Sequence, residues 1–160
     1  GADTDALTLR SATPKIAAAV PDGSVVLAYA GVAPDFTQLL ARAQEIALGD
    51  TMRTGEAPTA SELAREIGLV LQDATLSKAR PYGVELIVAG ADDDGAPALY
   101  HIDAAGGVTA WRAVAIGRGA ASHMARLEEG FEAGGDLAAG KALAAKALAP
   151  EGKEPRAAAV

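Results

Sequence analysis

The stretch from residue 84 to residue 102, VELIVAGADDDGAPALYHI, decides the fold. It holds two apolar runs, at 84–90 and 96–102, on either side of the acidic turn DDDG at 92–95. Two such runs joined by a short connection rich in Asp and Gly predict an antiparallel β-hairpin. Pro97 fits this interpretation, because a proline near the start of a strand is tolerated there without its ladder donor.

Further strands are expected on both sides of this hairpin. They cover residues 5–11, 15–20, 24–30 and 108–116, with a last short strand at 156–160. Pro21-Asp22-Gly23 predicts a tight turn between the second and third of these runs. Most of the runs are apolar at nearly every position, which is typical of strands that are covered on both faces.

Helical periodicity separates the strands into two groups. The first helix begins near Pro34 and is expected to end at Gly49, and the second begins at Thr59, which forms a capping-box pattern with Glu62. The two later helices are expected at 120–131 and 136–148. In the earlier of these two, the inward-facing residues are expected to be Met124, Leu127 and Phe131.

Groups of strands that alternate with pairs of helices favour antiparallel sheets with helices outside them. The predicted fold is therefore α+β: a four-layer αββα sandwich of two antiparallel sheets between two helix layers. Residues 1–150 are expected to form a single domain, and residues 151–160 a tail or a short final strand.

Composition excludes several classes of function. The net charge of −7 argues against nucleic acid as a partner, because phosphate binding needs clustered Lys and Arg. The absence of cysteine excludes disulfides, thiolate zinc sites and a cysteine nucleophile. No apolar run approaches the roughly 18 residues of a membrane helix, and the N-terminus lacks the pattern of a signal peptide. The sequence therefore predicts a soluble, cytoplasmic protein with no membrane partner.

An ordered set of motifs resembles the proteasome subunit family. The segments that carry the resemblance are KI at 15–16, AGVAPD at 30–35, RPYGVELIVAG at 80–90, LYHID at 99–103, AWRAVAIG at 110–117 and LEEGF at 127–131. They are similar to the "KI…SGLVADAR" and "LYQTDPSG…WKAxAIG" stretches of α-type subunits. The resemblance implies the sandwich of an N-terminal-nucleophile hydrolase and a non-catalytic place in the ring of a threonine protease complex for protein degradation.

The resemblance also raises the question of catalysis, because active members of the family use an N-terminal threonine. Thr4 lies only 11 residues before Lys15, too close for the strand and hairpin that separate the two in active relatives, so no catalytic residue is predicted. Asp3, Lys15 and Arg118 are interpreted as remnants of the catalytic-type motif. Arg118 stands where catalytic subunits carry a serine, and its guanidinium would put a permanent charge near any nucleophile. The Gly117-Arg118-Gly119 form instead resembles α subunits.

The resemblance assigns a different role to Lys15. In α subunits the corresponding lysine lies in a pocket between neighbouring subunits that receives the C-terminal carboxylate of an activator. The matching residues here are Lys15, Gly31 and Val32. An ammonium group suits a carboxylate, and glycine permits a close backbone approach. A lysine at the start of a strand with its head in water is the alternative interpretation.

Other chemistry is weakly indicated. His101 and His123 lie in different elements without a second ligand at metal-binding spacing, so each is interpreted as a structural histidine. The run at 92–95 lacks the glycine and glutamate positions of a calcium loop and predicts a solvated turn. Gly117-Arg118-Gly119 before a helix suits a tight turn better than an anion site. No metal and no cofactor is predicted.

Three functions remain open at this point. The first is a structural subunit, whose expected partners are other proteasome-like subunits in a ring, an ATPase or another activator, and the unfolded protein substrates of the complex. The second is a catalytic threonine-peptidase relative, β-like or a bacterial homologue, whose nucleophile strand is missing from this chain. The third is a stand-alone module that reuses the fold without a part in proteolysis.

Overall fold

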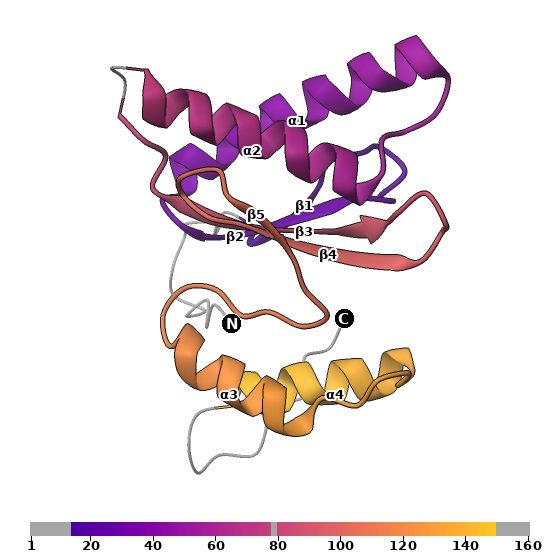
Figure 1. The fold of residues 1–160 in the computed structure, drawn as a ribbon, viewed down its shortest axis with the longest axis vertical. Coiled ribbons are helices and arrows are strands. Elements are labelled where there is room, and N and C mark those ends of the chain that lie inside the picture. Colours follow the sequence, from indigo (N-terminus) through magenta and orange to yellow (C-terminus); the bar gives the residue numbers. More distant parts are fainter. Residues whose placement is uncertain (1–13, 78–79, 150–160) are drawn as a thin grey trace, which may run out of the picture. The chain divides into compact units, whose positions relative to one another are not determined.

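The computed structural model describes residues 14–77 and 80–149 (Figure 1). The elements are β1 (Ile16–Ala18), β2 (Val26–Gly31), α1 (Ala33–Thr54), α2 (Ala60–Leu76), β3 (Val84–Ala91), β4 (Pro97–Ile102), β5 (Val108–Ala110), α3 (Ala120–Gly130) and α4 (Leu137–Leu148). They fall into two compact units that divide after Ala110, and each unit is described by itself.

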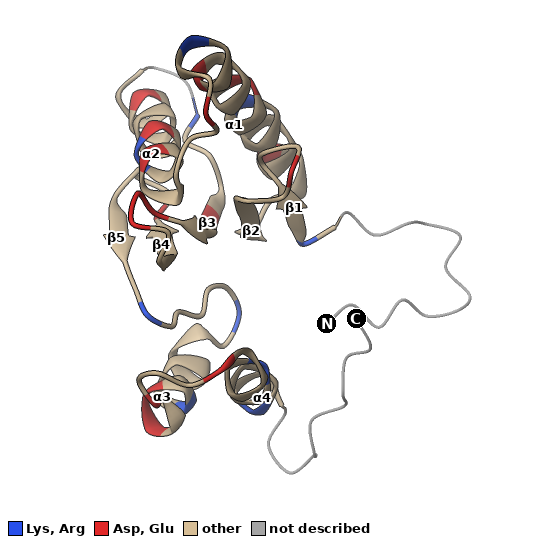
Figure 2. Cartoon of the chain, turned by 90° about the vertical axis from the view of Figure 1, so that its right-hand side faces the viewer, with Lys and Arg blue, Asp and Glu red and all other residues tan. Residues whose placement is uncertain are grey.

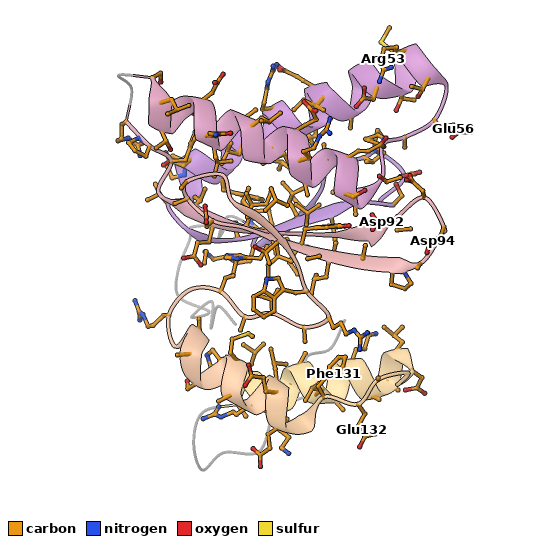
Figure 3. All side chains as sticks on the ribbon, in the orientation of Figure 1. Arg53, Glu56, Asp92, Asp94, Phe131 and Glu132 are labelled. Atoms are coloured by element: carbon orange, nitrogen blue, oxygen red, sulfur yellow. The ribbon has the colours of Figure 1, made fainter. Side chains whose placement is uncertain are left out.

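The first unit is built on a five-stranded sheet in the order β1-β2-β3-β4-β5, with every neighbouring pair antiparallel. The expected hairpin of β3 and β4 is confirmed, with Ala91 opposite Pro97 beside its turn and Leu86 opposite Ile102 at its far end. Asp92 stabilises the connection, because its carboxylate accepts bonds from Tyr100 Oη at 2.7 Å and from the backbone N–H of Ser61 at 3.0 Å (Figure 3). The hairpin is thereby tied to the first turn of α2.

Helices α1 and α2 lie on one face of this sheet, and charged residues are distributed along both of them (Figure 1 and Figure 2). Among the acidic and basic residues of the described part of the chain, Asp35 of α1 is the one that is buried. The core lies between the two layers and consists mainly of aliphatic side chains. Its largest fully buried members are Phe36, Leu27, Leu39, Leu63, Ile67, Leu71, Leu86, Ile102, Val25 and Val88. Strand residues alternate between this core and the other face of the sheet, as the period of two requires.

The start of α2 is confirmed in detail. Thr59 accepts a bond from the N–H of Glu62, and the Glu62 side chain accepts from the N–H of Thr59, so the expected capping box is formed. The predicted end of α1 at Gly49 is wrong. The helix continues to Thr54 and ends at Gly55, whose left-handed φ of 87° is well suited to glycine. A glycine inside a helix costs only about 1 kcal/mol, and burial of Ala47 and contact of Ile46 with the core hold α1 together around Gly49.

Three strand predictions need correction or stay open. The strand expected at 108–116 is only three residues long, because residues 111–116 have no ladder partner in the part of the chain that the structure describes. The strands expected at 5–11 and 156–160 lie outside the described residues. An α+β fold with an antiparallel sheet is confirmed. The described residues form one such sheet, and the four-layer arrangement stays a prediction.

The face of the sheet opposite α1 and α2 is mainly apolar and incompletely buried, although it also carries Glu85 and His101 at one end. It carries Ile16, Val26, Ala28, Ile87, Ala89 and Leu99. Ile16 is 65% exposed, and the others are half-buried. The sequence predicted that both faces of the sheet are covered. Among the described residues, completely buried strand residues are found only on the face packed against α1 and α2.

The second unit contains the helix pair α3 and α4, close to the ranges expected from the sequence. Asp136 caps α4 by accepting from the N–H of Ala139 at 2.8 Å. At the other end of α4, the carbonyl of Ala147 lies 2.8 Å from His123 Nδ1 and accepts a bond from Arg126 Nη1 at 3.1 Å. Leu127 is buried and Met124 is half-buried, but Phe131 was expected to point inward and is 38% exposed, because the helix ends just before it.

No helix among residues 14–77 and 80–149 combines the length and the apolarity that a bilayer crossing requires.

Two leucines of α2 provide a test of the helix–sheet core. Replacement of the fully buried Leu63 by alanine is expected to lower the free energy of unfolding by about 2–5 kcal/mol, because it removes apolar contacts and leaves a cavity. Leu69→Ala in the same helix is the matched control, since Leu69 is half exposed. Urea unfolding followed by circular dichroism measures both variants, and equal losses would contradict the placement of the core.

Candidate functional site

Lys15 lies immediately before β1, at the edge of the sheet. Its carbonyl accepts a bond from the N–H of Tyr29 at 3.3 Å, which fixes the backbone of Lys15 beside β2. Its ammonium nitrogen lies 4.0 Å from the centroid of the Tyr29 ring. Such a cation–π contact contributes about 0.5–1 kcal/mol at an exposed site. No carboxylate of the described residues lies within ion-pair distance of this exposed ammonium group.

Tyr29 is itself held by the core. Its ring stacks on the ring of Phe36, with centroids 4.0 Å apart and planes 13° from parallel. Lys15 and Phe36 must lie on opposite faces of the Tyr29 ring, because one face cannot hold both at that distance. Phe36 is fully buried in the first turn of α1. The positive charge of Lys15 therefore rests on an aromatic support anchored between helix and sheet.

Gly31 is the last residue of β2, and Val32 connects it to α1. Gly31 has a φ of 118°, and a side chain there would collide with the carbonyl of Gly83, so glycine is required. The N–H of Val32 donates to the same carbonyl at 2.9 Å. Val32 is 45% exposed, which leaves an apolar side chain at the surface immediately after the end of β2, the strand that carries Tyr29.

Asp35 lies in the first turn of α1, directly after this connection, and is almost completely buried, at 2% exposure. Its carboxylate accepts two bonds from the Arg80 guanidinium, at 2.7 and 2.8 Å, and one from the N–H of Gly83 at 2.8 Å. The Arg80 bonds, followed by the Gly83 bond, lower the pKa of the Asp35 carboxyl to about 2. Asp35 also lies in the first turn of α1, where a negative charge is favourable.

Sequence reasoning missed the pairing of Asp35 with Arg80. The two residues lie 45 positions apart, and no periodic pattern connects them. A signal was present nevertheless. An acidic residue in the first turn of a helix is common, but one that lies on the apolar side of that helix needs a cationic or N–H partner.

Comparison with known proteins identifies the family. The family model described as proteasome subunit matches residues 2–154. The chain belongs to the proteasome subunit family.

Individual relatives are α-type subunits of this family. The chain is 35% identical over 130 residues to the probable proteasome subunit alpha type-2 of Schizosaccharomyces pombe, which is 80% of this chain and 52% of that protein. It is 33% identical to proteasome subunit alpha type-2 of Saccharomyces cerevisiae, over 77% of this chain and 49% of that one. Proteasome subunit alpha 2 of Haloarcula marismortui is 38% identical, over 80% and 52%. The chain thus spans about half the length of these relatives.

The interpretation of three residues as remnants of a catalytic-type proteasome motif stays a prediction. Asp3 lies outside the described residues, Lys15 belongs to the first unit, and Arg118 belongs to the second. Arg118 is exposed in a turn between two glycines of positive φ, Gly117 and Gly119. Their carbonyls accept from the N–H groups of Ala120 and His123, so this connection has the bonds of a tight turn into α3.

The histidines have structural contacts in this proteasome family member. His123 bonds the carbonyl of Ala147 near the end of α4. His101 is half-buried in β4, and its Nε2 lies 3.8 Å from a carboxylate oxygen of Glu85 in β3. The acidic run at 92–95 is the β3–β4 turn, with Gly95 at a φ of 75°. The absence of a metal or cofactor stays a prediction.

The buried Asp35 carboxyl makes stability dependent on acid. Its pKa lies below the ordinary value, so its contribution to stability is present above about pH 4 and is lost as pH falls toward about 2. Asp35→Asn is expected to destabilise the protein near neutral pH, and the loss relative to wild type is expected to shrink across that acid window. Urea midpoints measured from pH 7 to pH 2 test this.

Asp50→Asn is the matched control for the acid dependence, because Asp50 pairs with Arg53 at 2.8 Å on the more exposed end of α1. If the urea midpoint of Asp35→Asn depends on pH in the same way as that of wild type, Asp35 is not the source of the acid dependence.

Proposed function

We propose that this chain acts as a non-catalytic α-type subunit in the ring of a self-compartmentalised protease, and that it contacts activators there. The observation that carries the proposal is its relation to subunits named α type over about four-fifths of its length. Partners on this proposal are neighbouring proteasome-like subunits, with unfolded proteins as the substrates of the whole complex. Ring assembly would follow the heterologous contacts of closed cyclic oligomers.

Lys15, Gly31 and Val32 are proposed to receive the C-terminal carboxylate of an activator. The exposed ammonium group of Lys15 supports this role. A lysine already paired strongly with a carboxylate of its own chain would be less able to bind the carboxylate of a ligand. The aromatic support of Tyr29 limits the positions of the lysine head without neutralising its charge. Val32 adds an apolar contact for the side chain that precedes a terminal carboxylate.

The four-layer sandwich is proposed as the complete form of the fold. The apolar face opposite α1 and α2 supports it, since Ile16 and its neighbours on that face are incompletely covered within the described residues. A second antiparallel sheet would bury such a face about 10 Å away.

The catalytic alternative is not favoured, because the relatives reported above are named α subunits. A stand-alone role predicts a monomer, whereas a ring subunit predicts a large assembly. These two predictions differ in a single measurement of mass.

Light scattering after size-exclusion chromatography tests assembly. The expected mass is several times the 16.0 kDa of one chain, because a closed ring contains several copies. A mass near 16.0 kDa at micromolar concentration would contradict the ring. Hydrolysis of a fluorogenic peptide that stops with a threonine-directed inhibitor would instead support the catalytic alternative.

Binding of a peptide carboxylate tests the pocket. The probe is a fluorescein-labelled decapeptide ending in leucine with a free carboxylate, compared with the same peptide as a C-terminal amide. Lys15→Ala is expected to weaken binding of the free carboxylate about tenfold or more, since a charge-assisted hydrogen bond is lost. Fluorescence anisotropy measures both peptides on the assembled protein.

Lys141→Ala is the control for that experiment, because it removes the same charge from an exposed position of α4. Equal weakening by both substitutions, or equal binding of carboxylate and amide, would contradict a specific pocket at Lys15.

A further inference from the structure

We infer that Asp35 and Arg80 are positioning residues of the proposed pocket. Their ion pair fixes the position, relative to Lys15, of the backbone of Gly31 and Val32, which is called the wall of the pocket below. This inference rests on the proposed function of that wall. It concerns residues that act through the backbone, since neither side chain is required to touch the bound carboxylate.

The wall is held by a closed set of hydrogen bonds. The N–H of Val32 donates to the carbonyl of Gly83 at 2.9 Å, and the N–H of Gly83 donates to Asp35 Oδ2 at 2.8 Å. The N–H of Asp35 donates back to the carbonyl of Val32 at 3.1 Å. Each of the three residues is therefore linked to the other two. Displacement of the Asp35 carboxylate would remove the acceptor of the Gly83 N–H and weaken the hold on Val32, while Gly31 would keep its ladder pairing with Val84.

Arg80 fixes the remaining freedom of the Asp35 carboxylate. Its two terminal nitrogens bind the two carboxylate oxygens separately, and Nη1 also donates to the carbonyl of Pro81 at 3.0 Å. The fork is thus anchored to the same backbone segment that ends at Gly83. A lysine carries the charge but lacks the planar pair of donors, so it cannot fix the rotation of the carboxylate in this way.

Side-chain packing offers little alternative support for the wall. A Cβ atom on Gly31 would collide with the carbonyl of Gly83, and one on Gly83 would lie 3.1 Å from Val32 Cγ2. The two segments therefore meet backbone to backbone. Since no side chains interlock here, the separation of the Gly31–Val32 segment from the Gly83 segment depends on hydrogen bonds. The ion pair with Arg80 stabilises the Asp35 carboxylate, which accepts one of these bonds from the N–H of Gly83.

The same wall is directly connected to the aromatic support of Lys15. Phe36 follows Asp35 in the first turn of α1, and its N–H donates to the carbonyl of Val32 at 3.1 Å. Its ring supports Tyr29, on which the Lys15 ammonium group rests. A shift of the first turn of α1 would therefore move both the wall and the support of the charge.

Arg80→Lys tests the inference, because it keeps the charge and removes the fork. Affinity of the assembled protein for the carboxylate decapeptide is expected to fall about three- to tenfold. The matched control is Arg53→Lys. Arg53 also pairs with an aspartate at 2.8 Å and has a similarly exposed side chain, 73% against 69% for Arg80. The control is expected to leave the affinity within twofold of wild type.

Two further readouts separate positioning from general stability. In the Lys15→Ala background, Arg80→Lys is expected to cause no additional loss of affinity, because both changes act through one interaction. Amide hydrogen exchange at Val32 is expected to become faster in Arg80→Lys and to remain as in wild type in Arg53→Lys. The exchange measurement needs no ligand.

The failures are distinguishable. If wild type and Lys15→Ala bind the decapeptide equally, the pocket itself is wrong, and the positioning role falls with it. If Lys15→Ala weakens binding but Arg80→Lys changes neither the affinity nor the exchange at Val32, the pocket stands and the positioning role alone is overturned.

Discussion

The burial of the Asp35 carboxylate is the constraint on which the first unit depends. A charged group out of water is costly unless donors surround it, and here the guanidinium of Arg80 and the N–H of Gly83 supply them. These donors come from the segment that leads into β3, whereas Asp35 belongs to α1. The pairing therefore fixes the start of the longest described helix against the central strands of the sheet, and Phe36 enters the core beside it.

The sequence predicted the local elements well where two independent signals agreed. The β3–β4 hairpin had apolar runs and turn chemistry together, and the start of α2 had both Thr59 and Glu62. It failed where one local signal competed with tertiary packing. Gly49 weakens α1 only slightly, while its neighbours on the helix contact the core. Residues 111–116 have a strand-like pattern, but a strand also requires a partner, which a pattern cannot identify.

The candidate site was predictable in part. Lys15, Gly31 and Val32 came from the family resemblance, and the structure adds the ring of Tyr29 and its stacking on Phe36. The contribution of Arg80 could not be read locally, since a bidentate ion pair across 45 positions depends on how β2 and β3 align. Strand register is the missing information. Once Gly31 stands opposite Val84, the segment before β3 must pass the start of α1.

The overall charge of the chain bears on how such a site selects its ligand. A net charge of −7 repels an approaching carboxylate at long range, so electrostatic steering by the whole chain does not favour binding. At physiological ionic strength, however, charges separated by more than about 8 Å are largely screened. The interaction with a single ammonium group at contact distance then outweighs the distant acidic residues. Selectivity for a ligand carboxylate therefore depends on the fixed positions of the Lys15 ammonium group and the Gly31–Val32 backbone, and not on the net charge of the chain. Phe36, which supports the Tyr29 ring, and Asp35, which pairs with Arg80, both lie in the first turn of α1 and help to fix these positions. The charge of Arg80 is compensated by Asp35, so it does not add a second free positive charge that would attract anions indiscriminately.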